Sequence, residues 1–247
     1  FDPEMRHGHK SKNVRIDGYK IYLAQDLDAD VTLAVAALPA NAAEAVGADK
    51  LEPQVSAQAP VTELHVDRAF LPSAWVQRMV SVCPDSVICR APSVRPGRAL
   101  YGKQDFTIDL EDGEVRCPAG QVVRIEGDAG SQRARFHAAQ CRPCPQRAQC
   151  QPLANDPHRE IQILPHEELL QRARRAVKTP EGRARLRERV VVEHANAHHA
   201  RRYTKQARYC GVPKNDFDAG RIAAVNNLLA MDRKMRALDA AEMQEAA

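Results

Sequence analysis

Residues 61–70 read VTELHVDRAF, and this stretch decides how the first third of the chain is expected to fold. The apolar residues of Val61–Val66 predict a β-strand that ends at the carboxylate of Asp67. A carboxylate at the C-terminal end of a strand lies where the active sites of open α/β sheets gather. Asp67 is therefore a candidate catalytic residue.

The sequence on both sides of this strand alternates between strand-like and helix-like segments, in the order β-β-α-β-α-β. Such an order predicts an α/β fold in which a mixed sheet carries flanking helices. Asp26, Asp28 and Asp30 predict a polar turn between the first two strands. The other predicted elements are a loop at 1–15, strands at 18–26, 31–38 and 86–89, and helices at 42–51 and 72–82.

The composition changes near Pro92, where short strands, turns and most of the cysteines begin. Asp112-Gly113 predicts a hairpin between residues 106–110 and 114–116. Thr179 followed by Pro180 predicts the start of a long helix that runs to about Arg202. We therefore expect the first part of the α/β domain at 1–95, a cysteine-rich β insertion at 96–164, the C-terminal helices of the domain at 165–237 and a flexible tail at 238–247.

Charge is distributed unevenly along the 247 residues, of which 44% are hydrophobic and 28% charged. No stretch approaches the roughly 18 continuous apolar residues of a membrane span, and the N-terminus lacks a signal-peptide pattern, so a cytoplasmic protein is expected. The net charge is only +4, yet residues 172–208 hold ten Arg and two Lys against three Glu. This excess suits a polyanion such as DNA, and an arginine-rich solvated helix face explains it equally well.

Four of the seven cysteines have the spacing of a metal site, since Cys141-x-x-Cys144 is followed by Cys150 and preceded by Cys117. An odd number of cysteines without a signal sequence favours a reducing compartment over disulfides. Two interpretations stay open. The first is a structural Zn²⁺ site, in which His137 or His158 can replace one of the cysteine ligands. The second is a set of reduced cysteines in a small β core. The remaining cysteines, Cys83, Cys89 and Cys210, are expected to be ordinary core residues.

Glu193 lies inside the predicted long helix and directly follows three apolar residues, which places it near the buried face. A carboxylate in that position needs a partner or a metal ion, and Arg189 lies one turn earlier, where it can form an ion pair. His194 and His198 have the spacing of a ligand pair, but a partly exposed helix face is the favoured interpretation. The sequence has no P-loop, nucleophile elbow or dinucleotide-binding fingerprint.

The order and spacing of several motifs resemble the C-terminal catalytic region of the DDE-class insertion-sequence transposases that carry a cysteine-rich insertion. Asp67-Arg68-Ala69-Phe70 resembles the surroundings of the second catalytic Asp, and Arg189-x-x-x-Glu193 resembles the helix that bears the catalytic Glu. The resemblance spans residues 10 to 230, approximately. The other matching motifs are Gly18-Tyr19-Lys20, Pro39-Ala40-Asn41, Asp105-Phe106-x-Ile108-Asp109, Cys117-Pro118-Ala119-Gly120, Arg208-Tyr209-x-Gly211 and Asn226-Asn227-Leu228.

The resemblance implies an RNase H-like fold with the cysteine-containing β insertion between Asp67 and Glu193. It implies that these carboxylates help to hold two Mg²⁺ or Mn²⁺ ions, which activate the attacking hydroxyl and stabilise the leaving oxygen of a phosphodiester. It also implies that the partner is double-stranded DNA, both the transposon ends and the target. A nucleoid-associated location and a homodimer are implied as well. The expected DNA contacts are Lys20, Arg189, Arg201, Arg202 and Arg208.

The sequence also departs from the family pattern. The family's first catalytic Asp lies on a strand upstream of the Gly18 motif, so this chain is expected to begin after it and not to cut or join DNA by itself. Leu186 and Ala200 stand where the family has Tyr and Lys, and Arg201 and Arg202 are expected to replace that Lys in part. The alternatives are a zinc-containing DNA-binding fragment without catalysis and a metal-dependent nuclease of similar fold.

Overall fold

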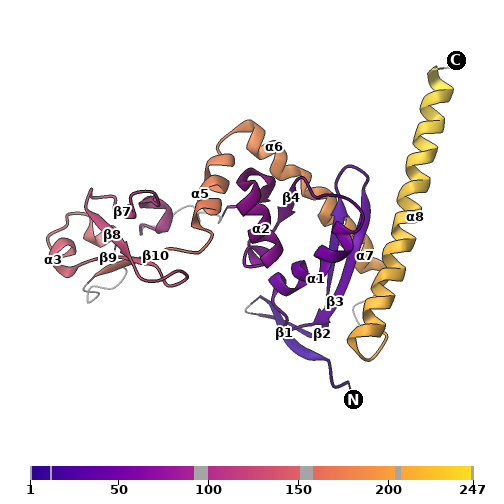
Figure 1. The fold of residues 1–247 in the computed structure, drawn as a ribbon, viewed down its shortest axis with the longest axis horizontal. Helices are drawn as coiled ribbons and strands as arrows, with labels where there is room; N and C mark the ends of the chain where they lie inside the picture. Colours follow the sequence, from indigo (N-terminus) through magenta and orange to yellow (C-terminus); the bar gives the residue numbers. More distant parts are fainter. Residues whose placement is uncertain (1, 12, 92–99, 151–157, 204–206, 246–247) are drawn as a thin grey trace. The chain divides into compact units, whose positions relative to one another are not determined.

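The computed structural model describes residues 2–11, 13–91, 100–150, 158–203 and 207–245. The chain forms two compact units: unit 1 comprises residues 1–90 and 176–247, and unit 2 comprises residues 91–175. Unit 2 therefore extends past residue 164, where the insertion was expected to end. Both units contain strands and helices (Figure 1), so the predicted α/β class is confirmed, whereas the RNase H-like arrangement stays a prediction.

Unit 1 begins with an antiparallel sheet in the order β1-β2-β3, formed by Arg6–Ser11, Val14–Asp26 and Val31–Pro39. The predicted aspartate turn joins β2 to β3, because the Asp26 carboxylate accepts bonds from the backbone N–H groups of Asp28 (2.9 Å) and Ala29 (2.7 Å). The loop expected at residues 1–15 is wrong, since β1 and the start of β2 pair with each other across that stretch.

Helices α1 (Glu44–Ser56) and α8 (Val212–Glu245) pack against this sheet. α8 lies beside the edge strand β3 (Figure 1) and satisfies its backbone groups. The Asn227 side chain accepts a bond from the Thr32 N–H (2.7 Å) and donates one to the Thr32 carbonyl (2.9 Å). The tail expected at 238–247 is helical through Glu245, because α8 continues to that residue. The core between the sheet, α1 and Trp75 contains Tyr22, Ala34, Ala36, Ala48, Leu51 and Val55.

Strands β4 (Leu64–Val66) and β5 (Val87–Cys89) form a separate, parallel pair. Helix α2 (Ala74–Val82) connects them and starts at Ser73, whose hydroxyl donates to the Asp49 carboxylate of α1 (2.6 Å). The described residues do not form the single mixed sheet that the sequence predicted, because β4 and β5 pair only with each other and the β1-β2-β3 sheet is separate.

The C-terminal helices of unit 1 begin as predicted, with the Thr179 hydroxyl accepting a bond from the Gly182 N–H (3.0 Å) at the start of α6 (Pro180–Glu188). The expected continuous helix to Arg202 is interrupted at Arg189, and α7 (Val190–Tyr203) follows. This break determines where the Arg189 side chain lies.

Unit 2 is built on a five-stranded antiparallel sheet with the order β10-β9-β8-β7-β6. The hairpin predicted at Asp112-Gly113 is confirmed, since β6 pairs with β7 and Gly113 has a φ of 67°. The strands are β6 (Thr107–Asp109), β7 (Glu114–Arg116), β8 (Val122–Glu126), β9 (Arg133–Phe136) and β10 (Arg159–Gln162). The helices of unit 2 are α3 (Ala138–Cys141), α4 (Arg147–Cys150) and α5 (Glu167–Ala176), with a short 3₁₀ helix at Lys103–Asp105. Unit 1 has 3₁₀ helices at Arg68–Phe70 and Pro84–Ser86.

Candidate active site

A cleft of about 1070 Å³ in unit 1 is lined by β2, α1, the β4 strand and α7. Asp67 lines it from the end of β4, and Glu193 lines it from the first turn of α7. The fold therefore brings the two candidate catalytic carboxylates, which are far apart in the sequence, to one cleft. Carboxylate oxygens open to solvent are ligands that suit hard cations such as Mg²⁺ and Mn²⁺.

Asp67 is held by an arginine rather than by a buried environment. Its side chain is 63% exposed, and its Oδ1 accepts a bond of 2.7 Å from the Arg189 guanidinium, which is 18% exposed. The expected place of Glu193 near the buried face is wrong, since its side chain is exposed. Arg189 binds Asp67 and, within the part of the chain described, forms no ion pair with Glu193. The helix break at Arg189 places this side chain against Asp67 instead of along the α7 surface.

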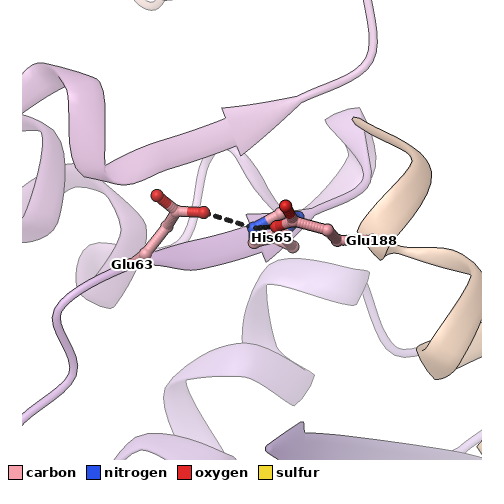
Figure 2. A group of neighbouring side chains, drawn as sticks. All are labelled: Glu63, His65 and Glu188. Atoms are coloured by element: carbon pink, nitrogen blue, oxygen red, sulfur yellow. Dashed lines mark hydrogen bonds and ion pairs between the residues drawn. The ribbon is translucent and has the colours of Figure 1, made fainter. Parts of the chain in front are cut away.

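A second polar cluster lies next to this pair and was not singled out from the sequence (Figure 2). His65 Nε2 lies 2.5 Å from Glu63 Oε1 and 3.6 Å from Glu188 Oε2. His65 is the middle residue of β4, Glu63 and Asp67 flank that strand, and Glu188 directly precedes Arg189. The alternation of polar residues in a short strand was the signal that could have indicated this cluster.

The imidazole of His65 is only 3% exposed, and its Nδ1 is buried without a hydrogen-bond partner among the described residues. Arg185 donates to the other oxygen of Glu63, Oε2, and so leaves Oε1 directed at His65. Burial by itself raises the pKa of Glu63, but the hydrogen bonds from Arg185 and His65 outweigh it and hold that pKa below its usual range. Glu63 is therefore a carboxylate at neutral pH.

The predicted DNA contacts differ in how available they are. Lys20 lines the cleft but is only 17% exposed, and its ammonium donates to the Glu44 carboxylate (2.9 Å). Arg201, Arg202 and Arg208 are exposed, although Arg202 also donates to the Asn226 side chain (2.7 Å). The arginine-rich stretch as a whole is divided between the two units, so it is not one helix face.

The four cysteines of the proposed zinc site lie together in unit 2 and line a small pocket of about 30 Å³. Cys117, Cys141 and Cys150 pack against the apolar core of the unit. Burial raises the pKa of the Cys141 and Cys150 thiols, which favours the neutral thiol in the absence of a metal. Among the described residues, no three of the cysteine Sγ atoms lie within 4.8 Å of one another.

The other cysteines and histidines that the sequence suggested as core residues or ligands lie outside these clusters. Cys89 is buried as expected, whereas Cys83 and Cys210 are exposed, so their expected place in the core is wrong. His194 and His198 are exposed on α7 and belong to no group of three ligand atoms in the ranges that the structure covers. Across those same ranges, the helices are too short or too polar to cross a membrane.

Part of this chain matches a known protein family. Residues 116–231 match the family described as the transposase DDE domain, a range that contains the four clustered cysteines and Glu193. No curated protein and no solved structure matches the chain. The match supports a DDE-class transposase catalytic region over residues 116–231.

Proposed function

We propose that this chain contributes to metal-dependent cleavage and transfer of DNA strands at the ends of an insertion sequence, with Asp67 and Glu193 as catalytic residues. The observation that carries the proposal is that both carboxylates line one cleft in a chain of this family. Cleavage of DNA that carries the insertion-sequence ends, dependent on Mg²⁺ or Mn²⁺ and lost in both Asp67→Asn and Glu193→Gln, tests the proposal.

The metal ions, the two carboxylates and Arg189 would have different roles in the cleft. Mg²⁺ or Mn²⁺ would supply the activation of the attacking hydroxyl and the stabilisation of the leaving oxygen. Asp67 and Glu193 provide hard oxygen ligands, and the exposure of both leaves them accessible to ions and to DNA. Arg189 orients the Asp67 carboxylate, and it can turn to a DNA phosphate once a cation takes its place.

We also propose an RNase H-like arrangement for unit 1, and the strands that line the cleft support it. Residues 19–26 of β2 pair with β3 along one edge, and β4 pairs with β5 along one edge. Within the described residues, the opposite edge of β2 pairs with β1 only up to Gly18, the opposite edge of β4 pairs with no strand, and both strands line the cleft. Two unpaired strand edges favour the addition of another strand between them. Such a strand would place a third carboxylate beside Asp67 and Glu193.

We further propose that exposed arginines near the end of α7 bind the DNA backbone. Replacing Arg201, Arg202 and Arg208 together by Gln is expected to weaken binding of duplex DNA, because each arginine that neutralises a phosphate releases counterions. The slope of log K against log salt should fall in magnitude by up to about 2.7, at about 0.9 for each phosphate that is no longer neutralised. Fluorescence anisotropy of a labelled duplex at several salt concentrations measures this slope.

The matched control replaces Arg78, Arg133 and Arg135 by Gln, which removes the same charge from arginines that pair with Glu52 and Glu160. This control should bind DNA with a slope close to that of the unmodified chain. Equal slopes for both triple variants would contradict a specific role for the arginines of α7 and the segment after it.

We propose a structural Zn²⁺ ion for the cysteine cluster of unit 2. Cys117 follows β7, Cys141 and Cys150 end α3 and α4, and Cys144 lies between these two helices. The four side chains line one pocket. Metal-free protein that is titrated with Zn²⁺ is expected to take up one ion there, because binding converts buried thiols into coordinated thiolates. Replacing Cys141 and Cys144 by Ser should abolish this uptake and unfold unit 2, as followed by loss of dispersed amide signals in NMR spectra.

The control for this prediction replaces Cys83 and Cys210 by Ser, since both are exposed and lie outside the cluster. The control should retain the ion and the folded unit 2. Thiols of the cluster that react freely in Zn²⁺-treated protein would overturn the zinc proposal.

A further inference from the structure

The cluster of Glu63, His65 and Glu188 has the composition and geometry of a metal site that is separate from the two proposed catalytic carboxylates. One ligand atom from each residue lies within 4.8 Å of the other two. Glu63 and His65 come from the segment of β4, and Glu188 comes from the last turn of α6 (Figure 2). A rigid strand and a helix end thus present three donors to one point.

The donors favour a transition-metal ion over Mg²⁺. An imidazole nitrogen with two carboxylate oxygens suits Zn²⁺ or Mn²⁺, whereas Mg²⁺ takes oxygen ligands almost entirely. Tetrahedral Zn²⁺ with bonds of about 2.0–2.1 Å holds its ligand atoms roughly 3.3 Å apart. The separations of 2.5 Å and 3.6 Å between His65 Nε2 and the two carboxylate oxygens bracket that spacing.

Charge and burial also favour a cation at this point. Two carboxylates face one imidazole, and Arg185 neutralises only the oxygen of Glu63 that faces away from the ring. A divalent cation bound to Nε2 of His65 would balance the charges of both carboxylates.

We propose that Glu63, His65 and Glu188 bind one Zn²⁺ ion, or another divalent transition-metal ion of similar preference, which fastens the end of α6 to β4. Asp67 follows this strand segment, and Arg189 follows Glu188, so the ion would fix the distance between the strand that bears Asp67 and the helix that bears Glu193. This positioning effect rests on the proposed function, whereas binding of the ion does not.

The test is titration of the metal-free full chain with Co²⁺, a spectroscopic substitute for Zn²⁺, followed by visible absorption. The site is expected to give d–d bands without the thiolate charge-transfer band that the cysteine cluster gives. Glu188→Gln and His65→Gln should each weaken the binding that produces these d–d bands by about 100-fold or more, since even loss of an outer-shell partner costs 10–100-fold. Glu188 is 52% exposed, so its replacement leaves the fold intact.

Two controls keep this result distinct from the proposed function. Glu181→Gln changes an exposed carboxylate of the same helix and should leave the titration unchanged. Asp67→Asn should also leave the d–d bands unchanged while it abolishes cleavage. Identical Co²⁺ titrations for the unmodified chain, Glu188→Gln and His65→Gln would overturn the proposal, as would a spectrum that contains thiolate bands alone.

Discussion

Asp67→Asn is expected to reduce metal-dependent cleavage of insertion-sequence ends by on the order of 10³-fold, which corresponds to about 4 kcal/mol of transition-state stabilisation. The amide keeps the size of the side chain but removes the negative charge and one strong oxygen ligand. Because phosphoryl transfer depends on the position of the metal ions, loss of one ligand affects both activation of the nucleophile and stabilisation of the leaving group. The measurement is the rate of strand cleavage in Mn²⁺ by the transposase polypeptide that contains this domain.

Folding should be nearly unaffected by that substitution, because Asp67 is 63% exposed and its ion pair with Arg189 is largely solvated. Asp232→Asn is the matched control, since Asp232 is also exposed and also pairs with an arginine, Arg236. The control should cleave at the unmodified rate. Cleavage by Asp67→Asn at a rate near that of the control would remove Asp67 from the catalytic residues.

Glu167→Ala is expected to lower the free energy of unfolding of unit 2 by about 3–5 kcal/mol, the usual cost of removing one partner from a buried ion pair. Glu167 is 1% exposed and accepts bonds from the Lys103 ammonium and from the Arg174 guanidinium (3.2 Å). Its removal leaves both cations without a counter-charge where α5 joins the sheet of unit 2. Urea unfolding of the chain, followed by signals assigned to unit 2, measures the change.

The neighbouring carboxylate provides the control for that measurement. Glu168 is 65% exposed and pairs with Arg172 one helical turn away, so Glu168→Ala should cost only about 0.3–0.5 kcal/mol. Similar losses in the two variants would indicate that Glu167 is not anchored by its cations. Glu167→Gln should fall between them, because the amide retains the packing and loses the charge.

Local features of the sequence determined much of the secondary structure. The aspartate turn after β2, the Thr179 cap of α6 and the hairpin at Asp112-Gly113 each depend on residues within a few positions of one another. Backbone conformation over such short distances is decided by propensity and by side-chain bonds to nearby N–H groups. The motifs around Glu193 and the cysteines likewise carried enough information to indicate a transposase family, which the match over residues 116–231 supports.

Tertiary structure alone decided which charged groups meet. The sequence allowed Glu193 to pair with Arg189, because residues four apart on one helix are neighbours, but the helix breaks at Arg189 and the guanidinium binds Asp67. The contacts of Glu63 and Glu188 with His65 also depend on tertiary structure, because β4 and α6 meet only through the packing of the chain between them. Long-range packing brings such pairs together, and no local pattern encodes it.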